Sequence, residues 1–310
     1  MTAKRKRRRS RTSSPASSSK EGRAQVAEKD GARKNEKKRG QPPARLPESP
    51  FPPLGTSLAR GFLVVGGSPS ILATAFLALL GTWGVFVLLG AEAGPRTLSL
   101  LLSAPPVHVF SDAPVALSPG SSGLYSVLSV AGLTALRGIT FALLGLLIVE
   151  GLREGRTSVR SVLGLLPRTA IVIGGLYLVQ FGIVVAAFQL LVGFLGQLAV
   201  LSIAAGLYFL VFAPVVAAAE GEGPRQALRR GVRAARLPGA RHLSMVMAYF
   251  LMLFYSGAIA PFGVLAPATP SIGVWAYSLG MTFVHVSVLA AFIYRWLAVR
   301  DQVPAAPGPR

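Results

Sequence analysis

The chain has 310 residues, of which 52% are hydrophobic and only 14% are charged, and its formal net charge is +20. So little charge is untypical of a soluble protein. The lack of cysteine excludes a disulfide framework and a thiolate metal site. The three histidines, His108, His242 and His285, are too far apart in sequence to indicate a histidine metal cluster.

Residues 1–50 hold 16 of the 32 basic residues, with Ser-rich and Pro-rich runs and almost no large apolar side chain. Such a segment cannot bury enough surface to offset the entropy of ordering, so we expect a disordered basic tail. Three roles are open for it. Positive charge can hold the tail in the cytoplasm, which needs no specific partner. The tail can also bind anionic lipid headgroups. Nucleic acid is a third option that we do not expect.

Residues 51–68 are expected to be a junction between the tail and the membrane domain. Leu58, Phe62 and Val65 share one helical face, which predicts a short helix lying in the membrane interface. Ser68–Pro69 then fits the N-cap and first position of the next helix. We expect a transmembrane domain over residues 69–298 and a short C-terminal tail over 299–310.

The fold class predicted for residues 69–298 is an all-α polytopic membrane protein. Apolar segments of about 20 residues suffice to cross a hydrocarbon core of about 30 Å. The run 169–219 has no charged residue in 51 positions, which suits two crossings joined by a tight turn. With the other apolar runs this gives six transmembrane helices, at residues 71–90, 125–150, 169–188, 198–219, 243–264 and 273–296.

The distribution of arginine predicts the orientation in the cell membrane. Basic residues cluster in the tail and in the ranges 153–168, 225–241 and 295–310, whereas the other connections hold only Arg96. Because positive loops stay inside, both termini should be cytoplasmic. Trp275 and Trp296 are about 31 Å apart along a helix, a spacing that matches the two aromatic belts of a membrane.

Two inner loops carry short amphipathic patterns with arginines, and we expect these patterns to be interfacial helices. Ser158 can cap the first, whose apolar positions are Val159, Val162, Leu163 and Leu166, and Pro224 opens the second. The arginines should contact lipid phosphates or a cytoplasmic protein partner. The candidate contacts are Arg156, Arg160, Arg225, Arg229, Arg230, Arg233 and Arg236.

The second loop, APVVAAAEGEGPRQALRRGVRAAR, also carries a family resemblance. It resembles the segment after a middle helix in bacterial proteins of the glycerophosphoryl diester phosphodiesterase membrane domain family and their six-helix relatives. The matching residues are Pro214, Glu220, Ala227, Leu228, Arg230, Gly231 and Arg233. The resemblance covers roughly residues 57–298 and implies a six-helix membrane topology. The catalytic barrel that accompanies some of those proteins has no counterpart here, so it implies no hydrolase activity.

Arg137 is the one charged residue well inside a predicted crossing. A charge at this depth is costly and should face the bundle or water. Gln180 and His285 lie at a similar depth, which predicts a midplane polar cluster of the three residues. Alternatively, Arg137 extends to the outer headgroups and His285 bonds a carbonyl group. Small residues beside Arg137 should let a neighbouring helix approach closely, namely Thr134, Gly138, Ala142 and Gly145.

The sequence contains no motif for catalysis. There is no Walker A, Gly-x-Ser-x-Gly or HExxH pattern, and no carboxylate lies deep in a crossing. We therefore predict no catalytic residue, no cofactor and no metal. The expected function is that of a membrane scaffold or membrane-homeostasis protein whose basic tail and inner loops engage anionic lipids. The alternative is a permease-type transport subunit that docks a cytoplasmic partner.

Overall fold

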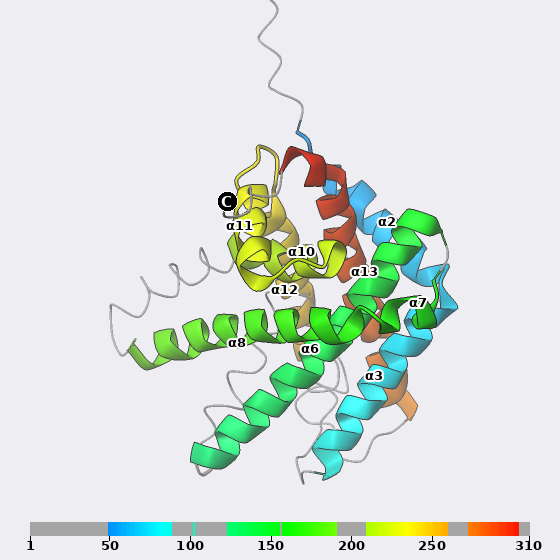
Figure 1. Ribbon diagram of the computed structural model, residues 1–310. Helices are drawn as coiled ribbons and strands as arrows, with labels where there is room; N and C mark the ends of the chain where they lie inside the picture. Colours follow the sequence, from blue (N-terminus) through cyan, green and yellow to red (C-terminus); the bar gives the residue numbers. More distant parts are fainter. Residues whose placement is uncertain are drawn as a thin grey trace, which may run out of the picture. The chain divides into compact units, whose positions relative to one another are not determined.

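The computed structural model describes residues 49–88, 102, 123–155, 157–190, 209–259 and 272–303. All regular structure in these ranges is helical, which confirms the all-helical prediction for this part of the chain (Figure 1). The chain divides into the units Met1–Glu48 and Ser49–Arg310, and the second unit contains every described residue. The predicted tail therefore lies outside the described residues, apart from its last two positions.

The described helices follow the predicted order of apolar segments. They are α2 (Leu54–Gly66), α3 (Pro69–Leu88), α6 (Gly123–Glu154), α7 (Val159–Leu163), α8 (Leu166–Leu190), α10 (Phe212–Glu220), α11 (Pro224–Ala235), α12 (His242–Ile259), α13 (Ile272–Val299) and the 3-10 turn η1 (Arg300–Gln302). Five of the six predicted crossings coincide with α3, α6, α8, α12 and α13. Only the second half of the segment 198–219 is described, and it is helical, as α10.

Two described helical stretches are long and apolar enough to cross a membrane, Thr134–Glu154 within α6 and Ile272–Gln302. A third is added if α2 and α3 form one bent span, because these helices meet at 85° across a short break. The break falls at Gly67 and Ser68, and α3 begins at Pro69 as the sequence predicts. The carbonyl group of Ser68 accepts the amide hydrogens of Ile71 and Leu72, so it starts the hydrogen bonding of α3.

Helix α13 is the centre of the described bundle. Every side chain from His285 to Ile293 is buried. Helices α2, α3, α6 and α10 all pack against α13, and Figure 1 shows α2 and α10 beside it. Because α13 is covered around this stretch, even its small side chains contribute to the core, among them Ala290 and Ala291.

The contact between α2 and α13 is backbone against backbone. Gly61 lies directly on α13, where a side-chain carbon would clash with the carbonyl group of Ser287 and lie 3.0 Å from the amide nitrogen of Ala291. The buried face of α2 is accordingly Ser57, Gly61 and Val65. Of the predicted apolar face, Val65 is buried in the protein, whereas Phe62 is exposed. A helix that meets another backbone needs small residues, whereas the prediction assumed a lipid surface.

The predicted stripe of small residues on α6 is confirmed as a packing surface. A side-chain carbon at Gly138 would lie 2.9 Å from the Cα atom of Gly174 on α8, and one at Gly145 would lie 2.9 Å from Ala218 on α10. The same stripe thus receives two different helices. Close approach at glycine is typical of helix packing in membranes, where van der Waals contact replaces the hydrophobic driving force.

We predict that Gly61→Ala lowers the free energy of unfolding by about 1–3 kcal/mol, because the added methyl group overpacks the α2–α13 contact. Gly55 belongs to the same helix and has no atom within 4 Å of its missing side chain. Gly55→Ala should therefore be neutral or stabilising by up to about 1 kcal/mol. Thermal unfolding of both purified variants in one detergent measures the difference. Equal stability of the two would contradict the close approach.

Candidate functional site

The exposed face of α11 is a row of arginines. This helix begins with Pro224 at its first turn, as predicted, and its buried face includes Ala227, Gly231 and Ala234. Gly231 lets α11 approach the start of α10, where a side-chain carbon would lie 2.9 Å from the amide nitrogen of Ala213. On the opposite face, at spacings of three and four residues, lie Arg225, Arg229, Arg233 and Arg236, all exposed, which we call the arginine stripe.

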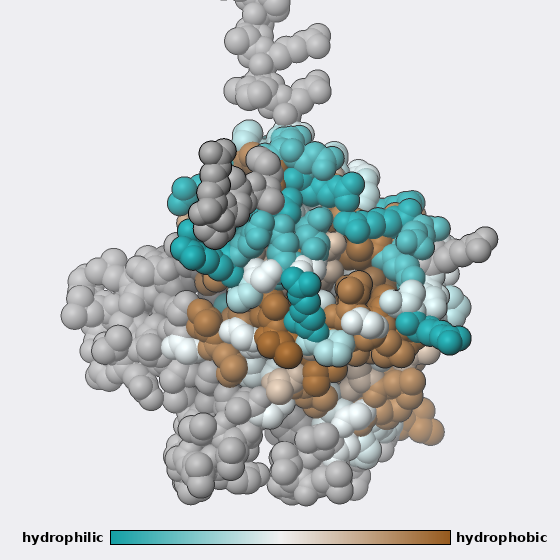
Figure 2. All heavy atoms as spheres, viewed as in Figure 1, coloured by the Kyte–Doolittle hydropathy of each residue, from teal (hydrophilic) through white to brown (hydrophobic). Residues whose placement is uncertain are grey.

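Hydrophilic residues gather at the end of the described bundle that carries α11, and hydrophobic residues lie on the flank below it (Figure 2). We call this the arginine-rich end. In the stripe, Arg236 also lies over the ring of Phe209, 5.9 Å from its centroid. Four cations on one helical face create a local positive potential that attracts anions, and salt screens it.

The first inner loop forms a short helix, α7, as predicted, but its capping differs from the prediction. Arg160 is exposed on α7, as expected, but Val162 is the buried residue of this five-residue helix, whereas Val159 and Leu163 are exposed. Ser158 precedes α7 without capping it through its side chain. The first turn of α7 is capped by Glu150 of α6 instead. Its carboxylate accepts hydrogen bonds from the Ser158 amide, at 2.7 Å, and from the Ser161 hydroxyl. Arg156 lies outside the described residues.

Arg230 points into the protein, opposite to its predicted direction. Its Nη1 atom forms a 2.5 Å ion pair with Glu222. Its Nε and Nη2 atoms donate to the carbonyl groups of Val303, at 2.9 Å, and Arg300, at 3.3 Å. The guanidinium also lies 4.9 Å from the ring centroid of Trp296. Since its donors are bound inside the protein, Arg230 does not belong to the set of exposed arginines that a headgroup can reach.

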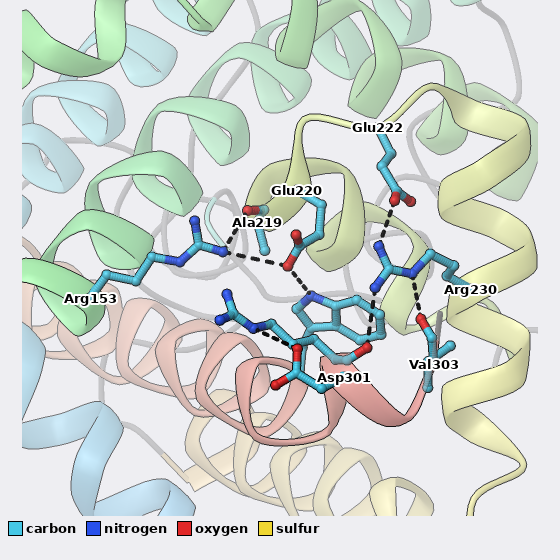
Figure 3. A network of polar contacts seen from close by, with 9 residues as sticks. Arg153, Ala219, Glu220, Glu222, Arg230, Asp301 and Val303 are labelled. Carbon is cyan, nitrogen blue, oxygen red and sulfur yellow. Dashed lines mark hydrogen bonds and ion pairs between the residues drawn. The ribbon is translucent and has the colours of Figure 1, made fainter. Parts of the chain in front are cut away.

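Glu220 joins three helices at the same end (Figure 3). Its carboxylate accepts the indole N–H of Trp296 at 3.2 Å and pairs with Arg153 of α6 at 3.5 Å. Arg153 also donates to the carbonyl group of Ala219. Trp296 is 0% exposed, so its predicted place in an aromatic belt was wrong, because both its N–H group and its ring are used inside the bundle.

Arg295, the neighbour of Trp296, is also buried, although its place in the sequence predicted only that it contributes to the positive charge on the inner side. It donates to the carbonyl group of Pro52 before α2 and, at 2.6 Å, to that of Ala240 before α12. The Ser57 hydroxyl is 3.4 Å away, and the guanidinium lies 4.9 Å from the ring centroid of Phe51. The signal available in the sequence was its position one residue before Trp296, inside an apolar run.

The three residues of the predicted midplane cluster are all buried, and two of them have partners that the prediction did not include. Gln180 donates to the carbonyl group of Leu210, at 3.4 Å. His285 shares a 2.6 Å hydrogen bond between its Nδ1 atom and the hydroxyl of Tyr249 on α12. Arg137 is only 7% exposed, next to the Gly138 contact with α8. The cluster itself stays a prediction.

Comparison of the chain with protein families, with curated proteins and with solved structures finds no match in any of the three. The relation to the glycerophosphoryl diester phosphodiesterase membrane domain therefore stays a prediction. Among these arginines, Arg230 and Arg295 are buried and bind carbonyl groups of distant segments, whereas the four arginines of the stripe are exposed.

We predict very different costs for removing two arginines that both pair with glutamate. The Arg230 and Glu222 side chains are only 9% and 13% exposed, so Arg230→Gln leaves a buried carboxylate unpaired and should cost about 3–5 kcal/mol of stability. The Arg153 side chain is 40% exposed, so Arg153→Gln should cost about 0–1 kcal/mol. Chemical unfolding in detergent measures both, and similar losses would refute the distinction.

Proposed function

We propose that this protein is an integral membrane protein without catalytic activity, which binds anionic lipid headgroups at its arginine-rich end and acts as a membrane scaffold or in membrane homeostasis. The arginine stripe of α11 is the observation that carries the proposal. Its four cations are exposed, while the opposite face of the helix is anchored on α10 through Gly231. A row of guanidinium groups on a helix packed in this way suits phosphate groups, which accept two hydrogen bonds from one arginine.

Exposed apolar stripes support the membrane part of the proposal. Large apolar side chains are exposed on α8 at Ile171, Leu178 and Val179. On α12 they recur every fourth residue, at Leu243, Met247, Leu251 and Tyr255. An apolar surface of this extent is unusual in water and is the normal surface of a helix that faces lipid. We therefore propose six crossings with both termini in the cytoplasm, the orientation that the arginine distribution favours.

The order of α11 and α12 along the chain supports a stripe at the level of the headgroups. The stripe ends at Arg236, and α12 with its exposed apolar stripe starts six residues later, at His242. Arginines at the end of a lipid-facing helix lie at the level of the phosphates, and each contributes about 1 kcal/mol near an anionic surface. The alternative, a permease-type subunit that docks a cytoplasmic partner, would use the same exposed arginines.

We predict that replacing the four stripe arginines with glutamine weakens retention of an anionic phospholipid by about tenfold or more. Phosphatidylglycerol bound to the purified protein is measured by native mass spectrometry, with phosphatidylcholine as the neutral lipid. The loss should be largest at low salt. Two further variants carry the same net charge. One replaces two stripe arginines with glutamine, Arg225 and Arg229, and the other replaces two exposed arginines on other helices, Arg60 and Arg168.

Weaker binding in the stripe variant than in its charge-matched counterpart supports a headgroup site on α11. Equal losses would mean that only net charge matters and would refute the site. If the stripe variants retain lipid like the wild type but lose a co-purifying cytoplasmic protein, the permease-type alternative is favoured instead.

The proposed topology predicts the side on which each connection lies. Reporter fusions at Gly120, Gly193 and Pro267 should be external, and fusions at Gly155 and Gly223 should be cytoplasmic. Paired enzymatic reporters that are active on opposite sides of the membrane make the measurement. A fusion on the unexpected side removes at least one crossing from the proposal.

A further inference from the structure

The end of the described chain is held by Arg230. The turn η1 follows α13, and Val303 after it is buried. Arg230 of α11 donates hydrogen bonds to the carbonyl groups of Arg300 and Val303. Its positive charge is balanced by the ion pair with Glu222. We call residues 300–303 the strap. These residues belong to the predicted short C-terminal tail, and Arg230 of α11 binds two of their carbonyl groups.

The strap contacts α11 through Arg230, which lies on a different side of the helix from the arginine stripe. Successive residues of a helix are rotated by about 100°, so Arg229 belongs to the stripe and Arg230 turns inward. Three nitrogen atoms of Arg230 bind acceptors on three different residues, and the ring of Trp296 supports the guanidinium from α13. These contacts fix the rotation of α11 about its axis, which decides where the stripe points.

We propose that Arg230 is a positioning residue for the arginine stripe, and that the strap is the element through which it acts. The function of the stripe in this statement rests on the proposed lipid binding, whereas the ordering of α11 by the strap does not. The contribution of the strap is not a charge effect, because the opposite charges of Arg300 and Asp301 cancel and these two side chains pair at 3.4 Å.

The decisive variant is Arg230→Lys in the full-length protein. It preserves net charge but replaces a planar fork of donors by a single ammonium group, which cannot reach Glu222, Arg300 and Val303 in the same geometry. Arg229→Lys is its matched control, one residue away on the exposed face. Hydrogen exchange of the backbone amides of residues 224–235, in detergent without lipid, reports the ordering of α11 directly.

We expect Arg230→Lys to accelerate exchange in α11 by about 10- to 100-fold, as the loss of hydrogen bonds to a charged group implies, and Arg229→Lys to leave it unchanged. Exchange in α2 and in the buried half of α13 should stay as in the wild type. A second pair of variants ends the chain at Val299 or at Ala305, so that in the longer one Val303 keeps its carbonyl group within a peptide bond. Only the shorter chain should show the acceleration, because the longer one retains both carbonyl groups.

Retention of phosphatidylglycerol by Arg230→Lys and by the two shortened chains tests the consequence for the stripe; Arg229→Lys serves only as the control for hydrogen exchange, because Arg229 belongs to the stripe. Retention should fall in Arg230→Lys and in the chain ending at Val299, although both retain every stripe arginine. The proposal is overturned if the exchange rate of α11 in Arg230→Lys or in the chain ending at Val299 equals that of the wild type. It is also overturned if exchange in α2 and α13 accelerates as much as in α11. If the wild type retains no anionic lipid, the proposed function fails, while the exchange data still decide the role of the strap.

Discussion

Two adjacent side chains of α13, Arg295 and Trp296, determine which segments meet at the arginine-rich end. Arg295 binds the carbonyl groups of Pro52 and Ala240, while Trp296 binds Glu220 and supports Arg230. A buried guanidinium is stable only when acceptors surround it. The start of α2, the turn before α12, the end of α10 and the inner face of α11 are therefore drawn to less than one turn of a single helix.

The same chemistry gives arginine two opposite roles within a few residues. Arg229 and Arg230 are neighbours in sequence, yet one is exposed to solvent and the other is neutralised by Glu222 and two carbonyl groups. Inward arginines use up their hydrogen-bonding capacity in the fold and make it specific. Outward arginines present their guanidinium groups at the surface, and in our proposal their direction depends on how firmly the inward ones hold α11.

The sequence was sufficient to predict where the helices lie, because long uncharged runs, Pro69 and Pro224 mark them clearly. It also predicted that Gly138 would meet another helix. It did not predict which faces meet, since a helix that is apolar all round has no periodic signal to separate lipid from protein. Thus Val65 was expected at the membrane interface but is buried with Gly61 in the protein, and Trp296 was expected at the surface. Arg230 was missed because its partners, Arg300 and Val303, are 70 or more positions away.

The pairing of α2 with α13 has a consequence for biosynthesis. Helix α2 is the first described helix to leave the ribosome, and its partner α13 is the last long one. Gly61 can meet Ser287 only after nearly the whole chain has been made. Until then the small-residue face of α2 has no cover, so the final step of assembly joins the two ends of the domain. A ribosome that stalls before α13 would leave a chain in which α2 has α3 and α6 beside it but lacks its main packing partner.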